Sequence, residues 1–341
     1  MATDFYSLTD AEQIQRLTAL ATAALAHWPG DFGAPVLIKY RENAVFSVTR
    51  SDGTCAALRV HRHAYHSDAA LHSELFWMSE LARVGMQVPP IVPTAAGGLF
   101  VHVGAPGVPE KRQVDMLGWL SGKPIGSAES GLSLEEGVSE RLYHSAGRLA
   151  AQLHNHSTAM TLPSAFTRHS WCEQGLLSDA PLWGRFWELA ALSPEERAVL
   201  TEARFKAAED LAALGKSSAA FGMIHADFVP ENLLNDGGRL QLIDFDDAGF
   251  GWHMFELATA LYWTLDEPNY PSICRALFDG YRSERPLSPA HEAMLPLFLF
   301  LRGSTYLGWL QTRAETQTAR ELGPLLIERT CRLARRYLAA H

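Results

Sequence analysis

The spacing of hydrophobic positions changes along the first 120 residues. Near the start, apolar side chains recur at helical spacing within residues 4–28, which predicts an amphipathic helix that ends before Pro29-Gly30. From residue 36 the apolar positions instead form short runs, rich in β-branched residues and separated by turn residues. Runs of this kind are typical of antiparallel strands, and they cover residues 36–41, 43–50, 54–61, 99–103 and 112–119.

A further helix is predicted between the third and fourth of these runs. Ser67-Asp68 is a favourable helix start, and residues 69–84 place their leucines on one face before Gly85 ends the pattern. The first 120 residues are therefore expected to form a sheet with one inserted helix.

After the linker 121–126 the pattern becomes mostly helical. The only strand-like region in this half is 232–245, which is typical of a hairpin that turns at Asp236-Gly237-Gly238. The predicted fold class is α+β with two domains, residues 1–120 and 121–341, and a hinge at about 116–124; a chain of 341 residues has room for two domains. Helical spacing extends over residues 135–157, 194–214, 254–265, 271–284, 290–314 and 321–340.

Composition and charge exclude some classes of function. Hydrophobic residues make up 47% of the chain, which is typical of a globular protein with a large core. The net charge of -9 argues against nucleic-acid binding, because phosphate backbones require clustered Lys and Arg. The sequence has no continuous apolar stretch of about 18 residues, as a membrane span would need, and a polar, acidic start. We therefore expect a cytoplasmic protein with no membrane or nucleic-acid partner, and the oligomeric state stays open.

Cysteine and histidine residues give no metal or disulfide pattern. The four cysteines lie far apart and form no CxxC pair. His61, His63 and His66 are close together, but no acidic or thiol residue follows them at a recognisable ligand spacing.

The segment 224–251 carries the most specific signal. It reads IHADFVPENLLNDGGRLQLIDFDDAGFG, with a His-Ala-Asp triplet at 225–227, then Asn232, and Asp244 after the expected hairpin. This order resembles the catalytic core of the aminoglycoside phosphotransferase and choline kinase superfamily, whose members are relatives of the protein kinases. The resemblance implies a bilobal protein-kinase-like fold and an ATP- and Mg²⁺-dependent phosphotransferase with an alcohol group as acceptor.

The chemistry of phosphoryl transfer explains why these residue types are needed. A carboxylate can orient the acceptor hydroxyl and receive its proton, and the resemblance gives this role to Asp227. Asn232 and Asp244 then supply oxygen ligands to Mg²⁺, which prefers hard oxygen donors. Of Asp246 and Asp247, Asp246 is the better candidate for a second carboxylate at the metal, because strand alternation places it on the same side as Asp244; the alternative is that either residue only caps the hairpin.

The amino-terminal half supplies the expected nucleotide site. Arg59 stands where the family usually has a strand lysine that holds the α- and β-phosphates, and Glu74 on the following helix is its expected partner. Asn43 lies in the turn expected to cover the phosphates. The adenine is expected against the backbone of residues 116–119, which include Met116, Leu117 and Trp119.

Two residues of the catalytic segment depart from the family pattern. Ala226 replaces a glycine, and Glu256 stands where related sequences usually show an aspartate that braces the catalytic loop. His225 is expected to hold the backbone of that loop.

The acceptor is expected to bind to the carboxy-terminal half, below Asp227. Arg302 favours a carboxylate-bearing acceptor such as a hydroxyl amino acid. The subgroup that this chain most resembles includes type II homoserine kinases and bacterial stress-response Ser/Thr kinases, so a small hydroxylated metabolite is the first candidate acceptor and a protein Ser/Thr side chain the second. An inactive nucleotide-binding regulatory protein is the third alternative. The candidate acceptor residues are Trp171, Trp183, Arg185, Tyr262, Arg302 and Tyr306.

Overall fold

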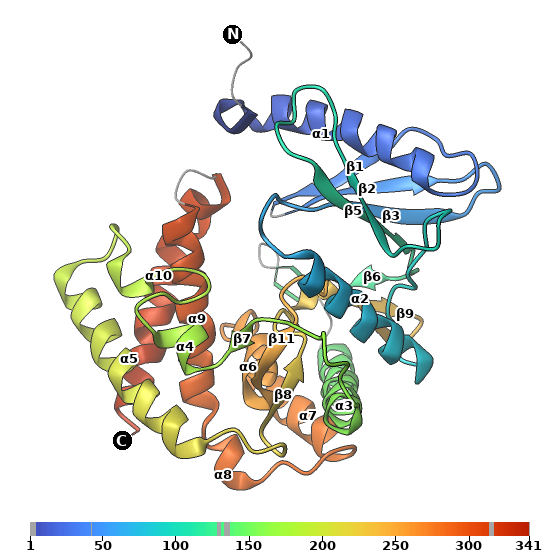
Figure 1. Ribbon diagram of the computed structural model, residues 1–341. Helices are drawn as coiled ribbons and strands as arrows, with labels where there is room; N and C mark the ends of the chain where they lie inside the picture. The colour runs from blue at the N-terminus through green and yellow to red at the C-terminus, as the bar shows by residue number, and fades with distance from the viewer. Residues whose placement is uncertain (1–4, 42, 128–130, 133–136, 314–316, 341) are drawn as a thin grey trace. The chain divides into compact units, whose positions relative to one another are not determined.

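The computed structural model describes residues 5–41, 43–127, 131–132, 137–313 and 317–340. The chain divides into two compact units (Figure 1). Unit 1 comprises Met1–Ser121 and Leu162–Thr167, and unit 2 comprises Gly122–Thr161 and Arg168–His341. Among the described residues, no helix combines the length and hydropathy that a membrane crossing needs.

Unit 1 is built on a five-stranded antiparallel sheet. The strand order is β1-β2-β3-β5-β4, and every neighbouring pair is antiparallel. All five strands were predicted from the hydrophobic pattern, with ends that differ by at most one residue. They are β1 (Val36–Tyr40), β2 (Ala44–Thr49), β3 (Cys55–Val60), β4 (Phe100–Val103) and β5 (Arg112–Gly118).

Two helices belong to this sheet. Helix α1 (Asp10–Ala24) lies along this sheet (Figure 1) and begins at Thr9 with a capping box to Glu12. Its leucines pack with Phe46 and Met116 of the sheet in one apolar cluster. Helix α2 (Asp68–Arg83) begins at the predicted Ser67 cap. The amino-terminal half of the fold is therefore as predicted.

Unit 2 is mainly helical. Helices α3 and α7 approach each other closely at two glycines: a Cβ on Gly147 of α3 would lie 2.0 Å from the carbonyl oxygen of Leu277, and a Cβ on Gly280 of α7 would lie 1.9 Å from that of His144. Any larger residue at these positions would separate the two helices. The helices of unit 2 are α3 (Val138–Ala159), α4 (Glu173–Leu177), α5 (Pro194–Leu214), α6 (His253–Tyr262), α7 (Tyr270–Arg282), α8 (Pro289–Glu292), α9 (Leu295–Thr312) and α10 (Gln317–Leu338).

Two three-stranded sheets in unit 2 hold the segment 224–251. The predicted hairpin forms from β9 (Leu233–Asp236) and β10 (Arg239–Leu242), and β6 (Lys123–Pro124) pairs with β9. The expectation that this half has no other strand was wrong. A second sheet joins β7 (Ser170–Trp171), β11 (Gly249–Trp252) and β8 (Phe221–Ile224), in that order (Figure 1).

Sequence pattern missed these strands for a physical reason. The longer two read FGMI and GFGW, which are too short and too rich in glycine to show alternation. They form through backbone pairing with each other, although more than twenty residues separate them. Strand β8 ends just before the loop that carries Asp227, and β11 starts just after the loop that carries Asp244, so this sheet anchors one end of each loop.

Candidate active site

Two loops of unit 2 meet at the backbone of Ile243. The amide of Ile243 donates to the carbonyl oxygen of Asn232 at 3.0 Å, and Nε2 of His225 lies 3.0 Å from the carbonyl oxygen of Ile243. His225 therefore holds the loop backbone, as expected from sequence. Because Asp227 and Asn232 are on the first loop and Asp244 follows Ile243, these contacts bring the loops of all three residues together.

Asp227 and Asn232 contact each other directly. The Asn232 amide nitrogen donates to the backbone oxygen of Asp227 at 2.9 Å and to its carboxylate Oδ2 at 2.7 Å. Asn232 is buried, whereas the side chain of Asp227 is 24% exposed. With its nitrogen used in this way, Asn232 has its amide oxygen for other ligands.

Arg302 holds the other side of Asp227. From the middle of α9, it donates through Nη2 to Asp227 Oδ1 at 2.7 Å and through Nη1 to the carbonyl oxygen of Ala226 at 3.0 Å. Nη2 also lies 2.7 Å from the Tyr306 hydroxyl oxygen. Burial lowers the pKa of Arg302, but Tyr306 and Asp227 more than reverse this effect, so the net shift is upward and the guanidinium stays charged. Both oxygens of Asp227 are thus engaged by described side chains.

Ala226 has a backbone conformation that usually requires glycine. Its φ of 64° lies in the left-handed region. Two hydrogen bonds from Glu256 support this turn: Oε1 accepts from the amide of His225 at 2.7 Å, and Oε2 accepts from the amide of Ala226 at 2.8 Å. The longer glutamate therefore braces the loop where relatives usually have aspartate. Burial raises the pKa of Glu256, and its contacts with His225 oppose that effect only in part.

Two more buried histidines, His154 and His253, lie next to Glu256. The rings of His154 and His253 stack at 4.2 Å, and Nε2 of His154 lies 3.7 Å from Oε1 of Glu256. Burial holds the pKa of His154 well below its usual value and lowers that of His253 to about 2. Burial also lowers the pKa of His225. All three rings are therefore neutral at neutral pH.

Asp244 and Asp246 are arranged differently from the expectation. Strand β10 ends at Leu242, and Asp244 has a left-handed φ of 68°, so strand alternation does not extend from Asp244 to Asp246. Asp244 and Asp246 therefore do not lie on one side of a strand, because the strand ends before Asp244. Asp244 is exposed and Asp246 is buried.

Arg168 and Trp171 fix the backbone after Asp244. Arg168 donates through Nη2 to the carbonyl oxygen of Asp246 and through Nε to that of Ala248 at 2.6 Å. Trp171 donates its indole N–H to the carbonyl oxygen of Asp247 at 2.9 Å. Arg168 could not be selected from the sequence, because its partners are backbone atoms 78 and 80 residues away.

Some of the predicted acceptor residues surround Arg302. Its guanidinium carbon lies 4.3 Å from the ring centre of Tyr306 and 5.7 Å from that of Trp183. Trp263, which the sequence analysis did not select, donates its indole N–H to the Tyr306 hydroxyl at 2.8 Å. We refer to Trp183, Tyr262, Trp263 and Tyr306 as the aromatic cluster; the rings of Tyr262 and Tyr306 are 4.9 Å apart.

Other predicted acceptor residues are buried or are already bonded to groups of the protein. Trp171 and Tyr262 are 1% and 0% exposed, so they pack in the interior of unit 2 and are not available to an acceptor in this conformation. Arg185 is exposed and bonds to Asp179 and Glu188. Arg302 itself is fully buried against Asp227, which differs from the expected contact with an acceptor carboxylate.

Unit 1 contains the expected pair of Arg59 and Glu74. Arg59 Nη1 donates to Glu74 Oε1 at 2.9 Å, while Nε and Nη2 donate to the two carboxylate oxygens of Asp115 at 2.8 and 2.7 Å. His61 Nε2 lies 2.9 Å from Oδ2 of Asp115. Burial alone raises the pKa of Asp115, but Arg59 and His61 hold it well below the usual range. Asp115, which sequence reasoning missed, makes the arginine part of a buried charge network.

The other expected nucleotide contacts lie on the same sheet. Asn43 accepts the amide of Arg62 through Oδ1 at 3.1 Å. Met116 and Leu117 are buried in β5, and Trp119 follows this strand with half of its surface exposed. Their part in nucleotide binding stays a prediction.

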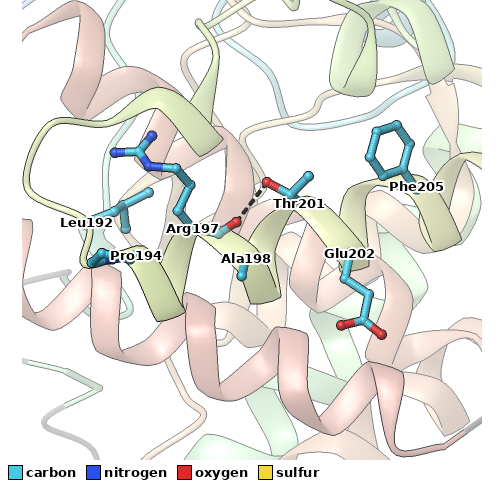
Figure 2. Close-up of a pocket in the computed structure, with 7 residues that line it drawn as sticks. All are labelled: Leu192, Pro194, Arg197, Ala198, Thr201, Glu202 and Phe205. Atoms are coloured by element: carbon cyan, nitrogen blue, oxygen red, sulfur yellow. Dashed lines mark hydrogen bonds between the residues drawn. The ribbon is translucent and has the colours of Figure 1, made fainter.

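A surface hollow on α5 does not belong to this site. Figure 2 shows its lining along one side of the helix, where Thr201 donates to the carbonyl oxygen of Arg197 at 2.7 Å. Its lining includes none of the candidate nucleotide, metal or acceptor residues. Its lining residues are Leu192, Pro194, Arg197, Ala198, Thr201, Glu202 and Phe205.

Similar proteins place the chain among kinases. The chain is 26% identical over 304 residues to the amicoumacin kinase of Bacillus subtilis (strain 168), a match that covers 82% of this chain and 80% of that protein. A homoserine kinase of Gluconobacter oxydans (strain 621H) is 33% identical over 152 residues, which are 41% of this chain and 48% of that protein. The expected subgroup is thus represented among the relatives.

Solved structures of kinases are similar to this chain over nearly its whole length. A microcompartment-associated aminopropanol kinase superposes with a TM-score of 0.82 at 31% identity, covering 94% of this chain and 97% of the other. An amicoumacin kinase in complex with AMP-PNP, Ca²⁺ and Ami superposes with a TM-score of 0.74 at 19% identity, covering 98% and 96%. The predicted kinase-like fold is confirmed.

The family model described as the phosphotransferase enzyme family matches residues 36–290, which is well over half of the chain and includes both Arg59 and the segment 224–251. The expected enzyme class, a phosphotransferase with an alcohol group as acceptor, is confirmed at the level of the family. This chain belongs to the phosphotransferase enzyme family.

Proposed function

We propose that this protein transfers the γ-phosphoryl group of ATP to a hydroxyl group of a small metabolite, with Mg²⁺ as the metal. The observation that carries the proposal is the Asp227 carboxylate, which is partly exposed and is held in one orientation by Asn232 on Oδ2 and Arg302 on Oδ1. A fixed, partly exposed carboxylate is what a hydroxyl group needs in order to be oriented for in-line attack.

Asp227 acts on the acceptor. It orients the hydroxyl and accepts its proton as the new oxygen–phosphorus bond forms and the bond to the leaving ADP oxygen breaks. The proton leaves on the carboxylate and the bonding electrons leave with ADP. Arg302 and Asn232 hold the carboxylate during this exchange and take no proton themselves.

The residues on the two loops fit a magnesium ion. Asn232 offers its amide oxygen because its nitrogen is bonded to Asp227, and Asp244 offers an exposed carboxylate at a turn. Asp246 is the third candidate ligand. Hard oxygen donors of this kind suit Mg²⁺, which would neutralise charge on the phosphates of a bound nucleotide. Support also comes from the similar amicoumacin kinase structure, which contains AMP-PNP and Ca²⁺.

Arg59 is the proposed phosphate-binding residue of unit 1. Its three guanidinium nitrogens bond to Asp115 and Glu74, so its side chain is held in place. We infer that it contributes charge to the α- and β-phosphates from this fixed position, unlike a flexible lysine. Asn43 and residues 116–119 complete the proposed nucleotide contacts.

An amino alcohol is the acceptor to test first. The similar aminopropanol kinase structure, at 31% identity over nearly the whole chain, favours this class. A hydroxyl amino acid is less favoured than the sequence alone suggested, because Arg302 is engaged by Asp227 and is not available for a substrate carboxylate. The kinases named above act on small molecules, which favours a metabolite over a protein acceptor.

The test is a transfer screen with γ-labelled ATP and Mg²⁺. The acceptor panel contains amino alcohols, hydroxyl amino acids, aminoglycosides and a model protein such as casein. We expect label to move to a small hydroxyl compound, with an amino alcohol as the best acceptor. Label found only on casein or on the enzyme itself would contradict the metabolite proposal, and no transfer to any acceptor would contradict the activity.

A further inference from the structure

Arg302 is a buried cation whose polar contacts run to the catalytic loop and to Tyr306. It lies within α9 and is 0% exposed. A guanidinium in such a place is costly unless it is paired and hydrogen-bonded. Its partners are Asp227, the carbonyl oxygen of Ala226 and the Tyr306 hydroxyl, at 2.7, 3.0 and 2.7 Å.

The aromatic cluster holds the guanidinium plane. Tyr306 and Trp183 lie within 4.3 and 5.7 Å of its central carbon, and Trp263 fixes the Tyr306 hydroxyl through a hydrogen bond of 2.8 Å. A delocalised cation is stabilised by aromatic faces at such distances. The position of Arg302 is therefore set from several directions before it contacts the loop.

Arg302 and Glu256 hold opposite ends of the same residue. Glu256 accepts the amide of Ala226 at 2.8 Å, and Arg302 donates to the carbonyl oxygen of Ala226 at 3.0 Å. Ala226 has a left-handed φ of 64°, which costs energy for a residue with a Cβ. A buried anion on one side and a buried cation on the other keep the strained residue, and with it the next residue, Asp227, in place.

We propose that Arg302 is a positioning residue for Asp227: it fixes both the carboxylate and the loop that presents it, and it does not bind the acceptor. The inference rests on the proposed role of Asp227 in phosphoryl transfer. Loss of Arg302 is then expected to lower kcat, because a misplaced carboxylate no longer orients the hydroxyl, and to leave the KM values for nucleotide and acceptor almost unchanged.

The kinetic test uses three substitutions and one matched control. Arg302→Gln removes the charge, Arg302→Lys keeps it without the planar fork, and Tyr306→Phe removes only the hydroxyl that holds Nη2. Arg112→Gln is the control, because Arg112 is also buried and faces aromatic rings, but it lies in unit 1, where it bonds to Tyr6 at 3.1 Å. We expect kcat to fall by about 10- to 100-fold in Arg302→Gln, the effect of one lost hydrogen bond to a charged group, and by less in the other two variants.

In the control, kcat per folded molecule is expected to stay within about twofold of the parent. A twofold or smaller change of kcat in both Arg302→Gln and Tyr306→Phe would overturn the proposal. So would a rise of the acceptor KM alone, because that result would make Arg302 an acceptor ligand. If Arg302→Gln does not fold, Arg302→Lys and Tyr306→Phe decide by the same criteria.

A second measurement does not depend on activity. Amide hydrogen exchange of the segment 224–233 reports whether Arg302 holds the loop. We expect faster exchange in this segment in Arg302→Gln and parent-like exchange in Arg112→Gln. If the parent enzyme transfers no phosphoryl group, the proposed function fails while exchange still tests the positioning role. Unchanged exchange in Arg302→Gln would refute it.

Discussion

Ala226 shows how one residue stores strain beside Asp227, the proposed catalytic carboxylate. A left-handed backbone costs an L-residue roughly 1–2 kcal/mol, and glycine avoids most of this cost. The related pattern has glycine at this position, but here the buried side chains of Glu256 and Arg302 hold the alanine in the same conformation. The catalytic loop therefore keeps its path without the usual residue.

Ala226→Gly is accordingly expected to be tolerated. Relief of strain offsets the larger chain entropy of glycine, so the free energy of unfolding should change by no more than about 1 kcal/mol, in the stabilising direction if at all. Denaturant unfolding measures this change. Ala64→Gly is a matched control, because Ala64 has a φ of 57° but is exposed in unit 1. A loss of more than about 2 kcal/mol in Ala226→Gly, without such a loss in Ala64→Gly, would contradict the expected relief of strain at Ala226.

Asp227 and Asp244 are expected to fail in different ways. Asp244→Ala should weaken metal-dependent nucleotide binding more than Asp227→Ala does, because Asp244 is a proposed metal ligand and Asp227 is not. Titration with a fluorescent ATP analogue, with and without Mg²⁺, measures the difference. Equal loss of binding in both variants would contradict their separate roles.

At the scale of elements, Glu256 links α6 to the catalytic loop. In Glu256→Gln an NH2 group replaces one of the two carboxylate oxygens. The backbone amide of His225 or of Ala226 would then face a donor and lose its acceptor. An unsatisfied buried donor costs about 1–3 kcal/mol, so Glu256→Gln should lose that much stability in denaturant unfolding. Glu284→Gln serves as the control, because the ion pair of Glu284 with Arg148 lies at the surface. A loss no greater than in the control would mean that the brace contributes little.

The sequence predicted elements well where their signals are local. In the strands of unit 1, apolar and polar residues alternate over five to seven residues, or turn residues mark the strand ends. The helices begin at capping residues such as Ser67. Strands β8 and β11 were missed because their pairing is long-range and their sequences are short and glycine-rich. The same distinction explains the candidate site, because Asp227, Asn232 and Asp244 lie within one short segment that resembles the family pattern.

Contacts between residues of distant elements could not be predicted from a local sequence pattern. Arg302 contacts Asp227 across 75 positions, and Asp115 contacts Arg59 across 56. Arg302 was selected for its charge but assigned to the acceptor, because sequence cannot show which anion a buried arginine meets. Strand alternation also failed for Asp246, where the backbone turns at Asp244.

At the scale of the whole molecule, buried histidines are expected to set the acid stability. His154, His225 and His253 are neutral in the folded protein because burial lowers the pKa of each, that of His253 to about 2. The unfolded chain binds these protons below pH 6.5, so it holds more protons than the folded protein there. Stability is then fully present above pH 6.5 and is lost as pH falls, by up to about 1.4 kcal/mol per pH unit for each histidine.

Burial raises the pKa of Glu256, so this residue makes the folded protein more stable as pH falls, opposite to the histidines. It is a single group, whereas three histidines contribute to the loss of stability. Urea unfolding between pH 7.5 and 5 measures the net slope. His253→Asn should reduce that slope by the equivalent of about one proton. A slope that is flat in the parent, or unchanged in the variant, would contradict the neutral buried state of these rings.

The central claim concerns Asp227, and single-turnover transfer tests it most directly. Parent enzyme and Asp227→Asn, each saturated with γ-labelled ATP and Mg²⁺, are mixed with the acceptor identified in the screen, and the transferred label is followed with time. The asparagine keeps the size of the side chain but cannot accept the proton, so the rate of transfer should fall by about 10²- to 10⁴-fold while ATP remains bound. A rate within a few-fold of the parent would contradict the assignment of Asp227, and with it the proposed mechanism.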